Sequence, residues 1–123
     1  QNVSEAVTSL MRSFRDLDMH VLFLCKEGKE NNDGVFIFGP KMASKPLGDA
    51  ITYFFDEVLA LRVIEDQDDD GNPVAARWLQ TRIGQGYTAK DRSGKLEAFE
   101  EPNLTALIQK LGFNINLEKE ESA

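Results

Sequence analysis

The stretch MHVLFLC, residues 19–25, decides how the rest of the chain is interpreted. It is almost entirely apolar, yet it is too short for a membrane span or an average helix. Such a run predicts a strand buried on both faces, as in the parallel sheets of α/β proteins. The run ends at Lys26 and Glu27, which places them at the carboxyl end of the strand, where open α/β sheets bind ligands.

An amphipathic helix is predicted over residues 2–17, directly before this strand. Apolar residues recur along it at steps of three and four, and polar residues fill the other face. A polar turn is expected over 28–34 and a short strand over 35–38. A loop over 39–48 follows, with Ser44 and Pro46 suited to begin a second helix.

The second half of the sequence predicts an antiparallel β-meander. Its strands are expected over 58–64, 74–83 and 87–90, joined by turns over 65–73 and 84–86. A final short helix is expected over 103–111, with Gly112 in the usual stop position. We therefore expect one domain over residues 1–112 and an acidic tail over 113–123.

Composition limits the class of protein. The chain has 123 residues, 41% of them hydrophobic, and a net charge of −7, which fits one globular domain. No apolar run approaches the roughly 18 residues of a membrane span, and a lone cysteine fits a cytoplasmic protein. The negative charge argues against a general nucleic-acid binder. However, the acid is clustered at 65–70 and 118–121, which leaves room for a local basic surface.

One motif resembles a metal site. Asp66-x-Asp68-x-Asp70-Gly71 matches the opening of a calcium-binding loop, but Arg77 occupies the position where a bidentate glutamate is required. A hairpin turn is favoured, and no metal site is assigned. A small metal-binding domain through residues 66–71 remains the third and weakest interpretation.

Three blocks of the sequence resemble a known family. They are FRDLDMHVLFLCKE at 14–27, GPKMASKPLGDAITYFFDEVLALRV at 39–63 and YTAKDRSGKLEAFEEPNLTALIQKL at 87–111. Together they resemble phage nucleotide-binding proteins, which are RecA-like ATPases associated with single-strand annealing and recombination. The resemblance spans roughly residues 1–111. It implies an α/β fold that forms the C-terminal half of a RecA-like P-loop NTPase core, with buried strands and the meander flanked by helices.

The resemblance also implies ATP and Mg²⁺ as cofactors of the intact protein. The family's G-x-x-x-x-G-K-[ST] phosphate-binding loop is absent from this sequence, which begins at Gln1 rather than at methionine. We therefore expect the phosphate-binding half to precede Gln1. On this interpretation the segment alone hydrolyses no ATP and is not expected to hold a cofactor.

Lys90-Asp91-Arg92 resembles the Lys-x-Arg pair that hexameric RecA-like motors extend toward a neighbour's ATP. Residues two apart on a strand share a face, so Lys90 and Arg92 can reach one phosphate while Asp91 points away. Arg92 would act as an arginine finger, with Lys90 as its partner, because a cation stabilises the charge of phosphoryl transfer. The alternative is a solvated turn with surface charges.

Two further sets of residues follow from the resemblance. Lys26 or Glu27 would sense the γ-phosphate, although Lys26 could instead extend from the strand end into solvent. The loop over 28–46 corresponds to a DNA-contacting loop, where Lys29, Lys41 and Lys45 would bind phosphates. Glu30 and Asp33 in the same loop oppose this. No exposed aromatic residue for base stacking can be named, because Phe36 and Phe38 could belong to the core.

The expected partners are copies of the same chain, single-stranded DNA and a single-strand DNA-binding protein, in the cytoplasm and without a membrane. The alternative is a non-enzymatic truncated module for interaction or oligomerisation. An in-frame phosphate-binding loop upstream in the gene would favour the first interpretation, and translation starting near Gln1 would favour the second.

Overall fold

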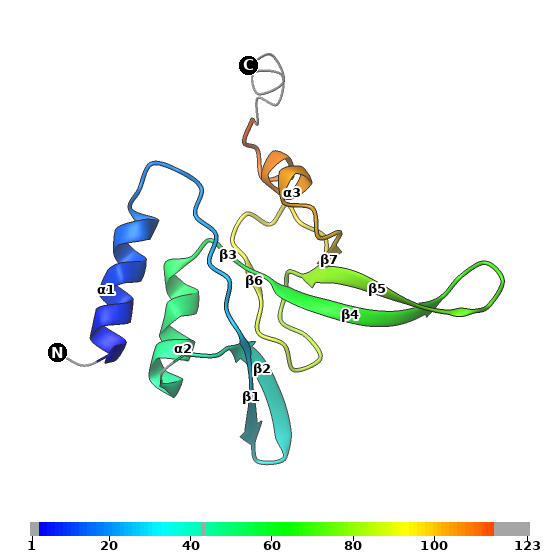
Figure 1. The fold of residues 1–123 in the computed structure, drawn as a ribbon, viewed down its shortest axis with the longest axis horizontal. Helices are drawn as coiled ribbons and strands as arrows, with labels where there is room; N and C mark the ends of the chain where they lie inside the picture. Colours follow the sequence, from blue (N-terminus) through cyan, green and yellow to red (C-terminus); the bar gives the residue numbers. More distant parts are fainter. Residues whose placement is uncertain (1–2, 43, 115–123) are drawn as a thin grey trace.

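The computed structural model describes residues 3–42 and 44–114, and this part of the chain is a mixed α/β protein with three α-helices, one short 3-10 helix and antiparallel sheets (Figure 1). The elements are α1 (Val3–Arg15), β1 (Glu27–Asn32), β2 (Val35–Pro40), α2 (Lys45–Ile51), the short helix η1 (Thr52–Phe54), β3 (Glu57–Val58), β4 (Ala60–Gln67), β5 (Pro73–Gln80), β6 (Lys90–Asp91), β7 (Phe99–Glu100) and α3 (Leu104–Lys110). The sheets pair β1 with β2, β3 with β6, and β5 with both β4 and β7. No helix in the described part is long and apolar enough to cross a membrane.

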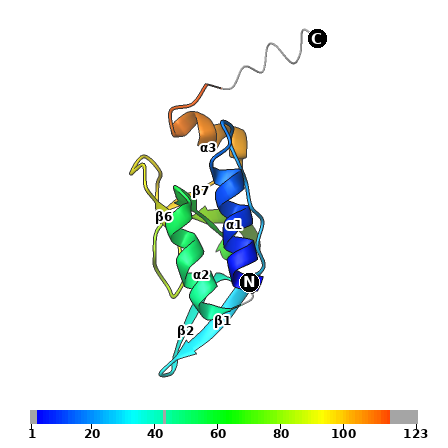
Figure 2. The same ribbon diagram turned by 90° about the vertical axis from the view of Figure 1, so that its left-hand side faces the viewer.

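The two N-terminal helices form the main hydrophobic cluster. Figure 2 shows α1 and α2 side by side, and Met11 of α1 is buried with Leu47 and Ile51 of α2. Phe23 and Phe55 pack against this cluster. The helix predicted over residues 2–17 from its apolar spacing is therefore confirmed as α1. Ser44 caps α2 as expected, because its Oγ accepts a hydrogen bond from the N–H of Leu47.

The buried strand predicted over residues 19–25 is wrong. Within the described residues the segment runs beside no other strand, and Figure 1 shows it as an unpaired trace between α1 and β1. Leu24 is 90% exposed, and Met19, Leu22 and Cys25 are exposed as well. The apolar composition indicated burial on both faces, but within 19–25 only Val21 and Phe23 are partly buried, and Phe23 packs against the α1–α2 cluster.

The polar stretch at 28–34 is mostly strand rather than turn. Residues 27–32 form β1, and only Asp33 and Gly34 turn the chain into β2. Both have positive φ angles, 53° and 86°, as a two-residue hairpin turn requires. The Asn31 side chain accepts a hydrogen bond from the N–H of Gly34 and closes the turn. The polar composition of this stretch indicated a turn, although most of it forms a strand.

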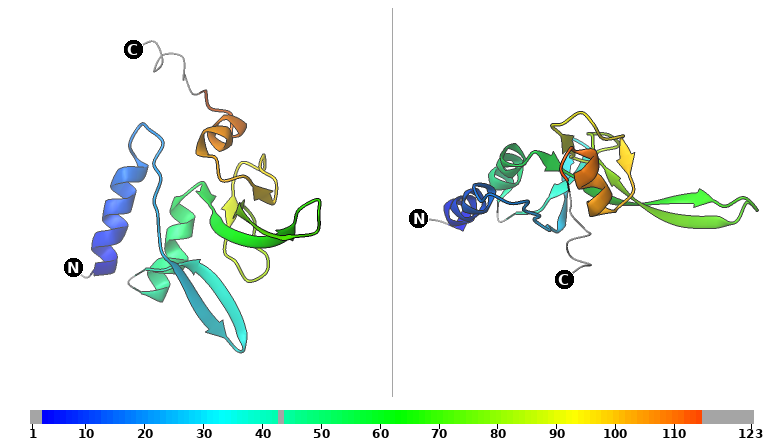
Figure 3. Two further views of the ribbon diagram at one scale, coloured as in Figure 1. Left: turned by 45° about the vertical axis from the view of Figure 1, so that its right-hand side comes forward. Right: turned by 90° about the horizontal axis from the view of Figure 1, so that it is seen from above.

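The predicted meander is half correct. β4 and β5 form a long hairpin that projects from the rest of the molecule (Figure 3), and Asp68 accepts hydrogen bonds from the N–H groups of Asp70 and Asn72 in its turn. The third strand was wrongly assigned to 87–90. The strand that pairs with β5 is β7, whereas Lys90 and Asp91 pair with β3. The strand expected over 58–64 is divided between β3 and β4.

The final helix agrees with the prediction at both ends. Asn103 caps α3 by accepting a hydrogen bond from Ala106 N–H, and Gly112 follows it with a φ of 103°. Leu107 is buried on this helix. Residues 115–123 of the predicted acidic tail lie outside the described residues.

Candidate functional site

Lys90 and Arg92 both contact the segment that joins α2 to β3. The Nζ of Lys90 donates a hydrogen bond to the backbone oxygen of Thr52 at 3.0 Å. The Arg92 guanidinium lies 2.5 Å from a carboxylate oxygen of Asp56. The backbone N–H of Arg92 also donates a hydrogen bond to the backbone oxygen of Asp56. Both cations therefore contact the segment between α2 and β3, whereas the carboxylate of Asp91 contacts the loop that follows β6.

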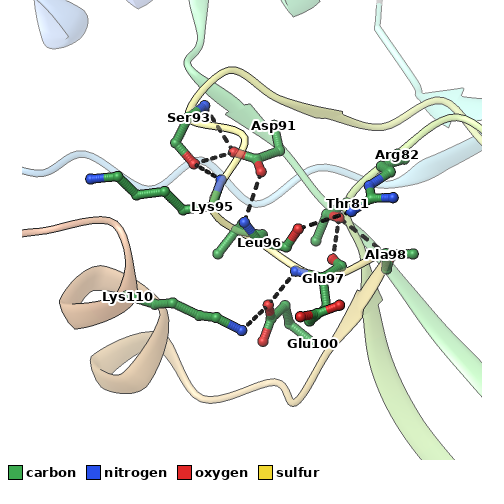
Figure 4. A network of polar contacts seen from close by, with 10 residues as sticks. All are labelled: Thr81, Arg82, Asp91, Ser93, Lys95, Leu96, Glu97, Ala98, Glu100 and Lys110. Carbon is green, nitrogen blue, oxygen red and sulfur yellow. Dashed lines mark hydrogen bonds and ion pairs between the residues drawn. The ribbon is translucent and has the colours of Figure 1, made fainter.

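Asp91 organises the loop that follows β6 (Figure 4). Its carboxylate accepts hydrogen bonds from the N–H and hydroxyl of Ser93 and from the N–H of Leu96. Burial alone would raise the pKa of Asp91, but the hydrogen bonds from Ser93 and Leu96 outweigh it and hold the pKa below its ordinary value. Asp91 is therefore a structural anion in this loop.

The same loop is tied to β5 and α3. The buried Thr81 donates its hydroxyl to the backbone oxygens of Glu97 and Ala98, and Arg82 donates to that of Leu96 (Figure 4). Lys110 of α3 lies 2.6 Å from Glu100 of β7, and this hydrogen bond lowers the pKa of Glu100. These contacts fix the loop and the strand that carries Lys90.

A second carboxyl group lies beside Asp91. Glu57 of β3 is the register partner of Asp91 in β6. Burial raises the pKa of Glu57 to about 7, and the adjoining Asp91 and Asp56 carboxyl groups add to the rise. The pair therefore carries close to one negative charge rather than two below neutral pH.

The cation pair is accessible from solvent. The Arg92 side chain is 56% exposed and that of Asp56 is 76% exposed, while Lys90 is half-buried. Exposed ion pairs contribute roughly 0–1 kcal/mol. An incoming anion can therefore replace Asp56 on the guanidinium at small cost.

Lys26 and Glu27 lie at the base of the β1–β2 hairpin. The backbone oxygen of Lys26 accepts a hydrogen bond from Lys41 N–H, and Glu27 begins β1 opposite Pro40. Both are exposed. Within the described residues, no hydrogen bond or ion pair connects either of them to Lys90 or Arg92.

Lys29 and Lys41 line an open cleft between the β1–β2 hairpin and α2. The cleft has a volume of about 810 Å³, and Glu27, Asp49 and Tyr53 line it as well. Its charge is therefore mixed. Lys45 begins α2, and its side chain lies outside the described part of the structure.

A row of cations and aromatic rings, which the sequence did not reveal, runs from the hairpin to β4. The Nζ of Lys29 lies 4.0 Å from the ring centre of Phe36 and 5.9 Å from that of Phe38. Phe38 stacks on Tyr87 with ring centres 4.7 Å apart and an interplanar angle of 15°. The guanidinium of Arg62 lies 3.8 Å from the centre of the Tyr87 ring. We call these five residues the aromatic row.

The sequence predicts a turn where β1 lies, and a turn does not align Lys29 with the aromatic residues of β2. Once Lys29 and Asn31 belong to a strand, their register with Phe38 and Phe36 puts all four on one face of the hairpin. Glu30 pairs with Ile37 and belongs to the other face. The alternation of Lys29, Glu30 and Asn31 was the available signal. Tyr87 and Arg62 are distant in sequence from the residues they contact, so no sequence pattern indicates their place in the row.

Comparison with known proteins adds no relative to this description. No family model, no curated protein and no solved structure matches the chain.

Proposed function

We propose that this chain binds single-stranded DNA through the aromatic row on the β1–β2 hairpin. The observation that carries the proposal is the pairing of Lys29 with Phe36, which is 47% exposed. Single-strand binding combines cations that follow the phosphates with rings on which bases stack. Phe36 offers the exposed ring, whereas Phe38 and Tyr87 stack on each other.

The distribution of charge supports this assignment despite the net charge of −7. Lys29 and Arg62 stand along the aromatic row, while the acidic segment at 66–70, the end of β4 and its turn, lies at the far end of the β4–β5 hairpin (Figure 3). Phosphate attraction falls off within a Debye length of roughly 8 Å at physiological salt. The local surface therefore matters more than the total charge.

The first experiment measures binding of a fluorescent oligothymidylate by anisotropy. Stacking on one aromatic side chain contributes roughly 1–3 kcal/mol per base, so Phe36→Ala should weaken binding about fivefold to a hundredfold. Phe113→Ala is the matched control, since Phe113 is similarly exposed but lies after α3. Equal affinity of wild type and Phe36→Ala would refute the stacking role.

We also propose that the chain is the C-terminal portion of a RecA-like ATPase of phage recombination or annealing. Two features support this: the exposed Arg92 beside the half-buried Lys90, and the unpaired apolar segment at 19–25, which neighbouring strands would cover. ATP and Mg²⁺ would be held by a P-loop half, and Lys90 and Arg92 would reach the polyphosphate of an adjacent protomer. Lys26 or Glu27 would respond to the γ-phosphate.

The test of this second proposal uses the protein with its P-loop half. Arg92→Ala should lower ATP turnover by roughly three orders of magnitude or more, as removal of an arginine finger does, with oligomer assembly unchanged. Arg92→Lys should restore only part of the rate, since it lacks the planar fork. Normal turnover in a fully assembled Arg92→Ala protein would remove Arg92 from catalysis.

A non-enzymatic oligomerisation module is the competing function, and the exposed Met19, Leu22 and Leu24 favour it. Such a module would self-associate without any dependence on nucleotide. Sedimentation with and without ATP, on the full translated product of the gene, separates the two functions.

A further inference from the structure

A second cavity lies between η1 and the residues that follow β5. Its volume is about 490 Å³, and Tyr53, Ile83, Ala89 and Lys90 are among the residues that line it. Tyr53 is 77% exposed and Ile83 is 80% exposed. Sites for small organic ligands are of this size and combine apolar walls with a few placed polar groups.

The position of Ile83 is fixed although its side chain is in solvent. The side-chain amide of Gln80, which is 3% exposed, donates hydrogen bonds to the backbone oxygens of Arg82 and Gly84, on either side of Ile83. The Gln80 oxygen in turn accepts from Arg62 at 2.6 Å. A buried amide thus holds an apolar side chain outward, and such preorganisation reduces the entropy lost on binding.

The other wall of the cavity carries both the aromatic ring and the link to a cation. Tyr53 belongs to η1, and the backbone oxygen of the preceding residue, Thr52, accepts the hydrogen bond from Lys90. Lys90 lines the cavity together with Arg82 and the three threonines Thr52, Thr81 and Thr88, and Arg92, which follows Lys90 two residues later, lies outside the lining. Asp91 also lines the cavity, but its carboxylate is engaged by Ser93 and Leu96.

We propose that this cavity, named here the Tyr53–Ile83 cavity, takes the base of a nucleotide whose phosphates lie toward Lys90 and Arg92. A planar ring fits between an aromatic and an aliphatic side chain. The phosphates would meet the two cations that Thr52 and Asp56 now hold. The proposal rests on the proposed polyphosphate role of Lys90 and Arg92, and it adds a recognition element for the base.

The base of a nucleic-acid strand has the same ring chemistry. The observations favour a nucleotide because two cations two residues apart match the concentrated charge of a polyphosphate. A strand would instead need cations spaced along its backbone. Oligothymidylate therefore serves as the competing ligand in the test.

The experiment is an NMR titration of the chain with ADP, pyrophosphate and oligothymidylate separately. Tyr53→Ala should weaken ADP binding about tenfold through lost stacking and leave pyrophosphate binding unchanged. Tyr53→Phe keeps the ring and should behave like wild type. Replacing Lys90 and Arg92 together by Gln should weaken both ADP and pyrophosphate.

The outcomes separate this inference from the proposed functions. Equal ADP affinity of wild type and Tyr53→Ala, or no ADP binding at all, overturns the Tyr53–Ile83 cavity as a base site. Oligothymidylate binding that depends on Tyr53, with ADP binding that does not, assigns the cavity to a nucleic-acid strand and also overturns the inference. Pyrophosphate binding that is unaffected by the double Gln variant instead refutes the cation pair. The cavity contains no residue of the aromatic row, so a result that overturns the base site leaves the DNA proposal unaffected.

Discussion

Among the described residues, Glu57 has the pKa that the fold shifts most, and Asp91 is its register partner. The folded protein keeps the Glu57 proton until pH about 7, whereas an ordinary glutamate releases it near 4.5. Between these values the folded state binds more protons than the unfolded state. The contribution of Glu57 to stability is therefore fully present below pH 4.5 and is lost as the pH rises through about 7.

We predict that Glu57→Gln, which mimics the protonated carboxyl group, flattens this part of the stability profile. Urea unfolding across the pH range, on wild type and variant, measures the difference. The lowered pKa of Glu100 acts in the opposite sense in both proteins and cancels in the comparison, because Glu57 is not among its causes. Parallel profiles for the two proteins would show that Glu57 titrates normally.

At the scale of elements, the aromatic row depends on one close contact between the hairpin and the segment after β5. Gly86 has a φ of 82°, and its backbone oxygen accepts a hydrogen bond from the N–H of Phe38 at 2.7 Å. A Cβ at this position would lie 2.6 Å from the backbone oxygen of Phe36. Only glycine permits this approach without a shift of the hairpin.

We predict that Gly86→Ala lowers the free energy of unfolding by about 1–3 kcal/mol from backbone strain, with a further loss from the clash. Gly71→Ala is the matched control, because Gly71 has a φ of 81° and nothing within 4 Å of its added Cβ. Denaturant unfolding compares the two variants. Equal destabilisation would mean that the clash contributes nothing.

Local chemistry explains which elements could be predicted. Ser44, Asn103 and Gly112 act within a few residues of the helix ends they define, so the sequence displays them directly. Strand partners are different. β7 pairs with β5 and β6 pairs with β3 across long loops, and no local pattern specifies those choices.

The same distinction applies to the candidate site. Lys90-Asp91-Arg92 was recognisable as a motif, but its partners Thr52 and Asp56 lie 38 and 36 residues earlier in the chain. The aromatic row joins residues from β1, β2, β4 and the segment after β5. Only the folded chain brings them together.

At the scale of the whole molecule, the unpaired segment at 19–25 presents three exposed apolar side chains, Met19, Leu22 and Leu24. Exposed extended segments pair readily with other chains. We predict that Leu24→Lys reduces concentration-dependent self-association of the chain in sedimentation velocity. Val63→Lys, on the exposed face of β4, is the control for a general effect of added charge. Identical association of wild type and Leu24→Lys would exclude the segment as the contact.

Single-stranded DNA binding by the β1–β2 hairpin is the central claim, and mapping of backbone amide shifts during an oligothymidylate titration tests it most directly. We predict that the largest shift changes occur at residues 29–38 and at Tyr87, and that the acidic turn at 66–70 does not respond. Shift changes that leave 29–38 unaffected, or no binding at low salt, would contradict the claim.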